Sequence, residues 1–136
     1  MLTHLRRYVF KEDDFLTFDF ETFSRIAAGV YDQKIPYTLD DCLMVFKSYF
    51  ENYEKYRGHP HPPIKANQIA RLMWTMPFMP PIDICSEIPD VAPESYPLLI
   101  QLHFKTRYRR CDYNINHFFS GDIRYMRSCE AEKGYV

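Results

Sequence analysis

The clearest hydrophobic pattern in the chain lies between Thr38 and Gly58. Large apolar side chains recur there every three or four residues, a spacing that places them on one face of a helix. These side chains are Leu39, Leu43, Phe46, Phe50, Tyr53 and Tyr56. Thr38 can cap the beginning of the helix, two aspartates follow in its first turn, and Gly58 can end it. The pattern therefore predicts a central helix over residues 39–57.

Shorter patterns of the same kind predict three further helices, over residues 66–76, 93–106 and 116–131. Pro93 suits the first turn of one of them, and Asn114 or Asn116 can cap another. Prolines and the lack of a sustained period predict a long ordered loop between residues 78 and 91, and an extended connector over residues 59–63.

The first 37 residues fit neither period cleanly. Residues 16–21 alternate like a strand, whereas residues 21–31 suit a helix. We expect a helix from about residue 13 to 31, with a short hairpin of residues 7–10 and 16–20 as the alternative.

The predicted fold is all-α, a compact single-domain bundle of four to five helices with a long proline-rich loop. Residues 38–136 are expected to form the helical core domain, and residues 1–37 an N-terminal extension packed on it. The C-terminal helix is expected to pack on the 39–57 helix.

The composition agrees with one ordered domain. A chain of 136 residues can bury one core, and 17% of its residues are Phe, Tyr or Trp. No apolar run approaches the roughly 20 residues that cross a bilayer, and no secretory signal is seen, so we expect a cytoplasmic protein. The cysteines are widely separated and are expected to be reduced thiols: Cys42, Cys85, Cys111 and Cys129.

The net charge of −1 hides a division into blocks. Residues 12–54 hold ten acids and three bases, residues 55–82 hold four bases and no acid, and residues 103–136 hold seven bases and four acids. This asymmetry permits a polyanion to bind at one face, and it excludes both a wholly basic nucleic-acid coat protein and a wholly acidic mimic of DNA.

Residues 105–116 form the segment best suited to contact a partner, because arginines and tyrosines alternate in it. Cationic side chains attract phosphates whatever the sequence, and tyrosine rings can stack on exposed bases. We expect a patch for a nucleic acid or a protein partner, with its last two members as outer contacts: Lys105, Arg107, Tyr108, Arg109, Arg110, Tyr113, Arg124, Arg127, Lys65 and Arg71. The alternative is a solvated loop whose arginines pair with the acidic N-terminal half.

The pair His59 and His61 has the His-x-His spacing of rolling-circle relaxases and nickases. That motif belongs on a central strand, whereas this pair lies in a proline-bound connector. We favour a stiff connector whose imidazoles pack on Tyr53 or Tyr56. A structural zinc completed by scattered cysteines stays open, although no Cys-x-x-Cys pair is present.

Two other patterns have weaker support. Residues 67–73 resemble the first helix of a helix-turn-helix unit. No recognition helix follows after a short turn, so we favour packing of their apolar side chains in the core. His103, Cys111 and His117 could form a thiol nucleophile with its base, yet nothing in the sequence places them together. His103 lies on an apolar helical face and is expected to be a hydrogen-bonded core histidine. No catalytic, cofactor or metal-binding residue is predicted.

Three stretches are similar to a group of small uncharacterised proteins carried by phages and conjugative elements of Gram-positive bacteria. They are Tyr56-Arg-Gly-His-Pro-His-Pro-Pro-Ile-Lys-Ala-Asn-Gln-Ile-Ala-Arg-Leu-Met73, Met76-Pro-Phe78 and Arg109-Arg-Cys-Asp-Tyr-Asn-Ile-Asn-His-Phe-Phe-Ser-Gly-Asp-Ile-Arg124. The resemblance covers roughly residues 39–130 and brings no catalytic residues with it. It implies a setting, a mobile genetic element, rather than an activity.

We therefore expect a non-enzymatic binding protein that contacts nucleic acid, or a protein that handles nucleic acid, through this basic and aromatic patch. The first alternative is an anti-defence protein, similar to anti-CRISPR proteins, that binds a host effector nuclease. The second alternative is a metal-dependent nuclease or nickase.

Overall fold

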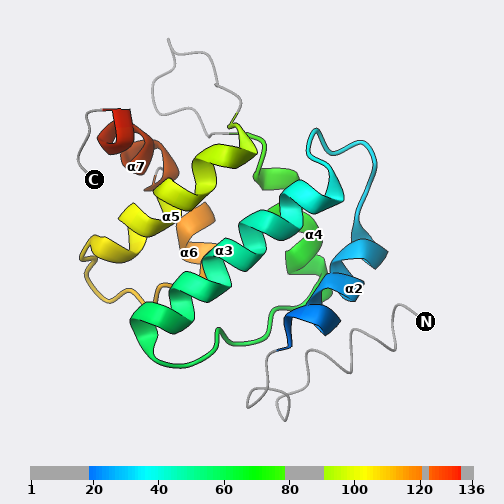
Figure 1. Ribbon diagram of the computed structural model, residues 1–136, viewed down its shortest axis with the longest axis horizontal. Coiled ribbons are helices and arrows are strands. Elements are labelled where there is room, and N and C mark those ends of the chain that lie inside the picture. Colours follow the sequence, from blue (N-terminus) through cyan, green and yellow to red (C-terminus); the bar gives the residue numbers. More distant parts are fainter. Residues whose placement is uncertain (1–18, 79–90, 121–122, 133–136) are drawn as a thin grey trace.

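The computed structural model describes residues 19–78, 91–120 and 123–132, which form helices joined by loops and contain no β-strand (Figure 1). The predicted all-α class is thus confirmed for this part of the chain. The helices are α2 (Phe20–Val30), α3 (Leu39–Arg57), α4 (Ala66–Thr75), η2 (a 3-10 turn, Pro93–Ser95), α5 (Tyr96–Lys105), α6 (Ile115–Phe119) and α7 (Ile123–Glu132).

Helix α3 begins and ends where the sequence predicts. The hydroxyl of Thr38 accepts from the backbone N–H of Asp41 over 3.0 Å, and the carboxylate of Asp41 accepts from the N–H of Thr38 over 3.1 Å. This reciprocal pair satisfies donors that the first turn of a helix leaves free. At the other end, Gly58 has φ of 82° and its N–H donates to the carbonyl of Glu54 over 2.9 Å. A left-handed residue after the last turn closes the helix.

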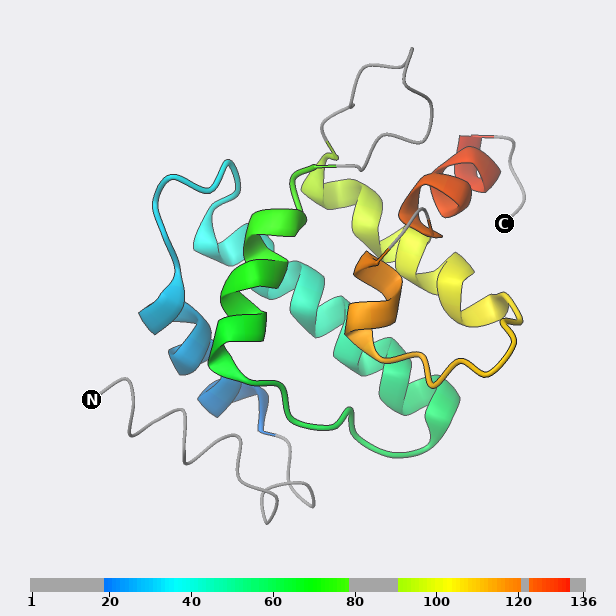
Figure 2. The same ribbon diagram turned by 180° about the vertical axis from the view of Figure 1, so that it is seen from behind.

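The helices pack around α3. Helix α5 lies beside α3 (Figure 1). In the view turned by 180°, α4 and α6 lie in front of α3 (Figure 2). Helix α2 packs on α3 and α4, and α7 packs on α5 and α6. Helices α2 and α7 therefore lie at opposite ends of the bundle (Figure 1).

Large rings fill the core. Phe23 of α2 meets Phe46 and Phe50 of α3 edge to face, at centroid distances of 4.9 and 5.1 Å. Further along α3, the ring of Tyr49 lies 5.0 Å from Phe104 of α5 and 5.5 Å from Phe118 of α6. Such tilted pairs add to the burial of apolar area, which is the main driving force for folding. One continuous core thus joins α2, α3, α5 and α6.

Two predictions about the C-terminal part are corrected. The single helix predicted over residues 116–131 is two helices, because Ser120 adopts extended backbone angles of −93° and 151° and ends α6. Helix α7 packs mainly on α5 and α6, whereas the contact with α3 is made by α6 through the rings of Phe118 and Tyr49.

The N-terminal expectations are partly tested. Residues 20–30 are helical, as the favoured alternative predicted. The alternative hairpin, the beginning of the predicted 13–31 helix and most of the predicted 78–91 loop involve residues 1–18 and 79–90, which lie outside the described residues.

Candidate functional site

The basic loop, residues 106–114, joins α5 to α6. Two of its residues have positive φ without being glycine, Arg110 at 51° and Tyr113 at 59°. Tyr113 anchors the loop through both its side chain and its backbone. Its hydroxyl donates to the carbonyl of Thr106 over 2.6 Å, and its carbonyl accepts from the hydroxyl of Tyr49 over 2.5 Å. The loop therefore has a defined shape that is tied to the core.

Exposed cations gather around this loop. Lys105, Arg107, Arg109 and Arg110 are all exposed. The last residue of α3, Arg57, is also exposed, and its guanidinium carbon lies 5.1 Å from the ring centre of Tyr113. We call these five side chains the basic end. Within residues 19–78, 91–120 and 123–132, none of the five makes an ion pair with a carboxylate.

The two tyrosines predicted to stack on bases are covered by neighbours. The ring of Tyr113 is stacked on Phe104 at 5.6 Å and lies under the Arg57 guanidinium. The ring of Tyr108 meets His103 at 5.0 Å and lies under the guanidinium of Arg127 at 5.7 Å. Both tyrosines are half-buried and support the loop, so the stacking part of the expected patch is not formed.

Arg124 and Arg127 of α7 do not belong to the surface. Arg124 is 1% exposed and donates to the hydroxyl of Tyr96 over 2.9 Å and to the carbonyl of Thr75 over 3.2 Å. Arg127 is 6% exposed and its Nε lies 2.8 Å from Glu130. The expectation is corrected for both, because their long stems are buried and the Nη1 group of each donates to a tyrosine hydroxyl inside the fold, that of Tyr96 or Tyr108.

The two outer contacts lie elsewhere. Lys65 precedes α4 and Arg71 is on it, and both are exposed. Helix α4 packs against α2, away from the basic loop (Figures 1 and 2). The structure therefore brings together Lys105, Arg107, Arg109 and Arg110, adds Arg57, and separates Lys65 and Arg71 from them.

His61 is a structural residue. It is 1% exposed, and its Nε2 accepts from the backbone N–H of Ile115, the first residue of α6, over 3.0 Å. Its Nδ1 lies 2.7 Å from the carbonyl of Pro62 and must donate to it, because a carbonyl only accepts. Both ring nitrogens are thus occupied and no metal ion can bind to either. The ring packs 4.6 Å from Tyr53, as the connector interpretation predicts.

No three potential ligands, from His, Cys, Asp and Glu, come together as a metal site within the described ranges. The exposed neighbour His59 packs 5.4 Å from Tyr53.

A chain of four hydrogen bonds runs through His103, whose donors can be assigned in order. The hydroxyl of Tyr49 donates its proton to the carbonyl of Tyr113, so its oxygen accepts from Nε2 of His103 over 3.1 Å. Nδ1 of His103 then accepts from the hydroxyl of Tyr108 over 3.0 Å, and that hydroxyl accepts from Arg127 over 2.7 Å. Burial lowers the pKa of His103 to about 3, so the ring is neutral. The prediction of a hydrogen-bonded core histidine is confirmed.

Cys111 and His117 do meet. The sulfur of Cys111 lies 3.2 Å from Nδ1 of His117, whereas His103 is used in the chain of hydrogen bonds above. The sequence offered Cys111 and His117 as candidates but nothing that places them together, since the loop between α5 and α6 includes two residues of positive φ, Arg110 and Tyr113.

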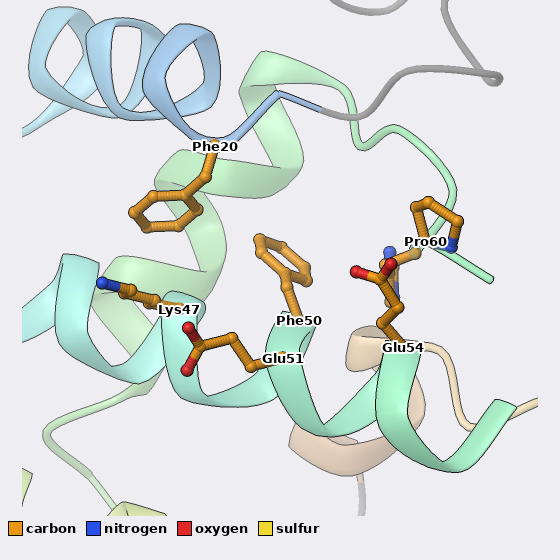
Figure 3. A pocket seen from close by; sticks show the side chains of 7 residues that line it. Phe20, Lys47, Phe50, Glu51, Glu54 and Pro60 are labelled. Carbon is orange, nitrogen blue, oxygen red and sulfur yellow. The ribbon is translucent and has the colours of Figure 1, made fainter. Parts of the chain in front are cut away.

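A small hollow of about 130 Å³ lies on another part of the surface (Figure 3). Its apolar wall is the edge of the core and its charged rim belongs to the exposed face of α3. The lining residues are Phe20, Lys47, Phe50, Glu51, Glu54, Pro60 and His61.

No protein-family model, curated protein or solved structure matches the chain. Among the described helices, none has the length and apolar character needed to cross a membrane.

Proposed function

We propose that the chain is a non-enzymatic binding protein whose basic end contacts the phosphates of a nucleic acid. The observation that supports this most is the gathering of five exposed cations from α3, α5 and the basic loop, without ion pairs to carboxylates in the described residues. A cation that is not neutralised from within attracts an external anion, and several in one place attract a polyanion.

The form of the contact follows from the tyrosines. Because the rings of Tyr108 and Tyr113 are covered, the surface offers guanidinium groups without free faces for bases. Arginine binds phosphate oxygens through two parallel N–H donors, and these contacts carry no base sequence. We infer binding that depends on the phosphate backbone and little on the bases. The resemblance to proteins of mobile elements suggests replication, transfer or regulation of such an element as the setting.

A second candidate is an anti-defence role against a host effector nuclease. Trp74 and Phe78, at and after the end of α4, are 41% and 42% exposed. Large exposed rings are enriched where proteins bind one another. A protein inhibitor would use this exposed apolar surface.

Fluorescence anisotropy with labelled single- and double-stranded DNA and RNA tests the proposal. We expect binding at low salt for all four probes, and the double variant Arg109→Ala/Arg110→Ala should weaken it by roughly tenfold or more. Lys65→Ala/Arg71→Ala is the matched control, because it removes the same charge away from the basic loop.

Equal weakening by both double variants would show that only net charge matters and would contradict a site at the basic end. Absence of binding at low salt would exclude the nucleic-acid function. A stable complex with a purified effector nuclease, without affinity for free nucleic acid, would support the anti-defence role instead.

A further inference from the structure

The sulfur of Cys111 lies between a proton acceptor and a proton donor. Nδ1 of His117 is 3.2 Å away, and the backbone N–H of Tyr113 donates to the same sulfur over 3.2 Å. The N–H can stabilise negative charge on the sulfur, while the imidazole can take the proton of the thiol. A nucleophile and a base within hydrogen-bond distance form the arrangement that activates thiols in proteins.

We propose that Cys111, activated by His117, is a reactive thiol that forms mixed disulfides with small disulfides bearing carboxylate groups, such as glutathione disulfide. The sulfur of Cys111 attacks one sulfur of the disulfide while its proton passes to Nδ1 of His117. A new S–S bond forms, the old one breaks, and the leaving thiolate takes the proton back. One thiol and one disulfide are consumed and one thiol and one mixed disulfide are produced, without any other oxidant.

The surroundings of Cys111 explain why a base is needed. Burial raises the pKa of the Cys111 thiol, the carboxylate of Asp112 raises it further, and the backbone N–H of Tyr113 and the charge of Arg57 act in the opposite direction. The sulfur therefore carries its proton near neutral pH and depends on His117 to remove it during the attack.

The loop conformation and charges favour a ligand of this class. Arg110 and Tyr113, on either side of Cys111, both have positive φ, which is costly for residues other than glycine. This backbone holds Cys111, a partly exposed residue, in the same loop as the exposed arginines of the basic end. Arg57 acts on it from α3, and Arg109 and Arg110 precede it in the chain. These cations attract a disulfide that carries carboxylates and repel one that carries ammonium groups.

The other described thiols differ from Cys111. Cys42 is fully buried, and burial raises its pKa to about 12. Cys129, half-buried on α7, serves as the internal reference for reactivity.

The experiment treats the full-length reduced protein with limiting dithiobis(nitrobenzoate), a disulfide with two carboxylates, and locates the label by peptide mass spectrometry. We expect Cys111 to be labelled faster than Cys129. His117→Ala should slow labelling of Cys111 by roughly tenfold or more and leave Cys129 unchanged. Labelling of Cys111 at the rate of Cys129, or a rate that does not respond to the loss of His117, would overturn the proposal.

A second measurement needs no variant and guards against misfolding of His117→Ala. The wild-type protein is treated with dithiobis(nitrobenzoate) and with cystamine, a disulfide with two ammonium groups. The rate with dithiobis(nitrobenzoate) is divided by the rate with cystamine at each cysteine. This ratio should be larger at Cys111 than at Cys129, so that the quotient of the two ratios exceeds one. A quotient of one or less would contradict the preference for anionic disulfides. Neither measurement depends on nucleic-acid binding.

Discussion

Replacing His61 tests how the proline connector holds the fold together. Phenylalanine keeps a ring between Tyr53 and Phe50, whose centroids lie 4.6 and 5.0 Å from the imidazole. It removes the acceptor for the buried N–H of Ile115, which then has no hydrogen-bond partner. Leaving one buried donor unsatisfied costs roughly 1–3 kcal/mol. We expect His61→Phe to lower the free energy of unfolding by that amount, measured by urea denaturation followed by circular dichroism.

The same variant should change how stability depends on pH. Burial lowers the pKa of His61 from 6.5 to about 4, so the unfolded chain takes up a proton at a pH where the folded chain does not. The stability that neutral His61 confers is present above pH 6.5 and is lost as pH falls toward about 4. At about 1.4 kcal/mol per pKa unit, the loss is on the order of 3 kcal/mol. His103 contributes a loss of the same sign, which the variant keeps.

Urea denaturation above pH 6.5, and at several values between 6.5 and about 4, measures both effects. In this range His61→Phe should lose stability less steeply than the wild type. His59→Phe is the matched control, because His59 is exposed and its replacement leaves Ile115 with its acceptor, so it should lose much less stability than His61→Phe. A wild-type slope in His61→Phe, or no loss of stability above pH 6.5, would refute the reasoning.

Two further predictions concern single atoms of the core and of a helix end. Tyr49→Phe removes the hydroxyl between His103 and the carbonyl of Tyr113, and should cost roughly 1–3 kcal/mol in urea denaturation; an equal loss in Tyr56→Phe, at an exposed position, would contradict this. Gly58→Ala should cost about 1 kcal/mol through its φ of 82° alone, since an added Cβ meets nothing within 4 Å. Gly58→Asn should lose less, because asparagine tolerates this conformation, and equal losses would argue against backbone strain.

The sequence predicted helix α3 because everything that defines it is local. The cap at Thr38, the glycine at Gly58 and the apolar spacing between them all act within a few residues. The division between α6 and α7 was missed because the apolar spacing continues across Ser120, where the backbone is extended and α6 ends.

The site was predicted only in part, since burial depends on distant partners. Arg124 looked like Arg109 in the sequence, but its acceptors are 28 and 49 residues away along the chain. Distant partners also explain why Arg57 was missed as a member of the site, because only the folded chain places its guanidinium against Tyr113. The tyrosine rings were expected to be free, whereas neighbours brought in by α3 and α7 cover them.

The salt dependence of DNA binding tests the central claim most directly. For duplex DNA, the slope of the logarithm of affinity against the logarithm of salt concentration is about −0.9 for each phosphate that is neutralised. We predict that Arg109→Ala/Arg110→Ala makes this slope shallower by nearly two, at about 0.9 for each lost contact, while Lys65→Ala/Arg71→Ala leaves it unchanged. The same slope in all three proteins would contradict a phosphate site at the basic end.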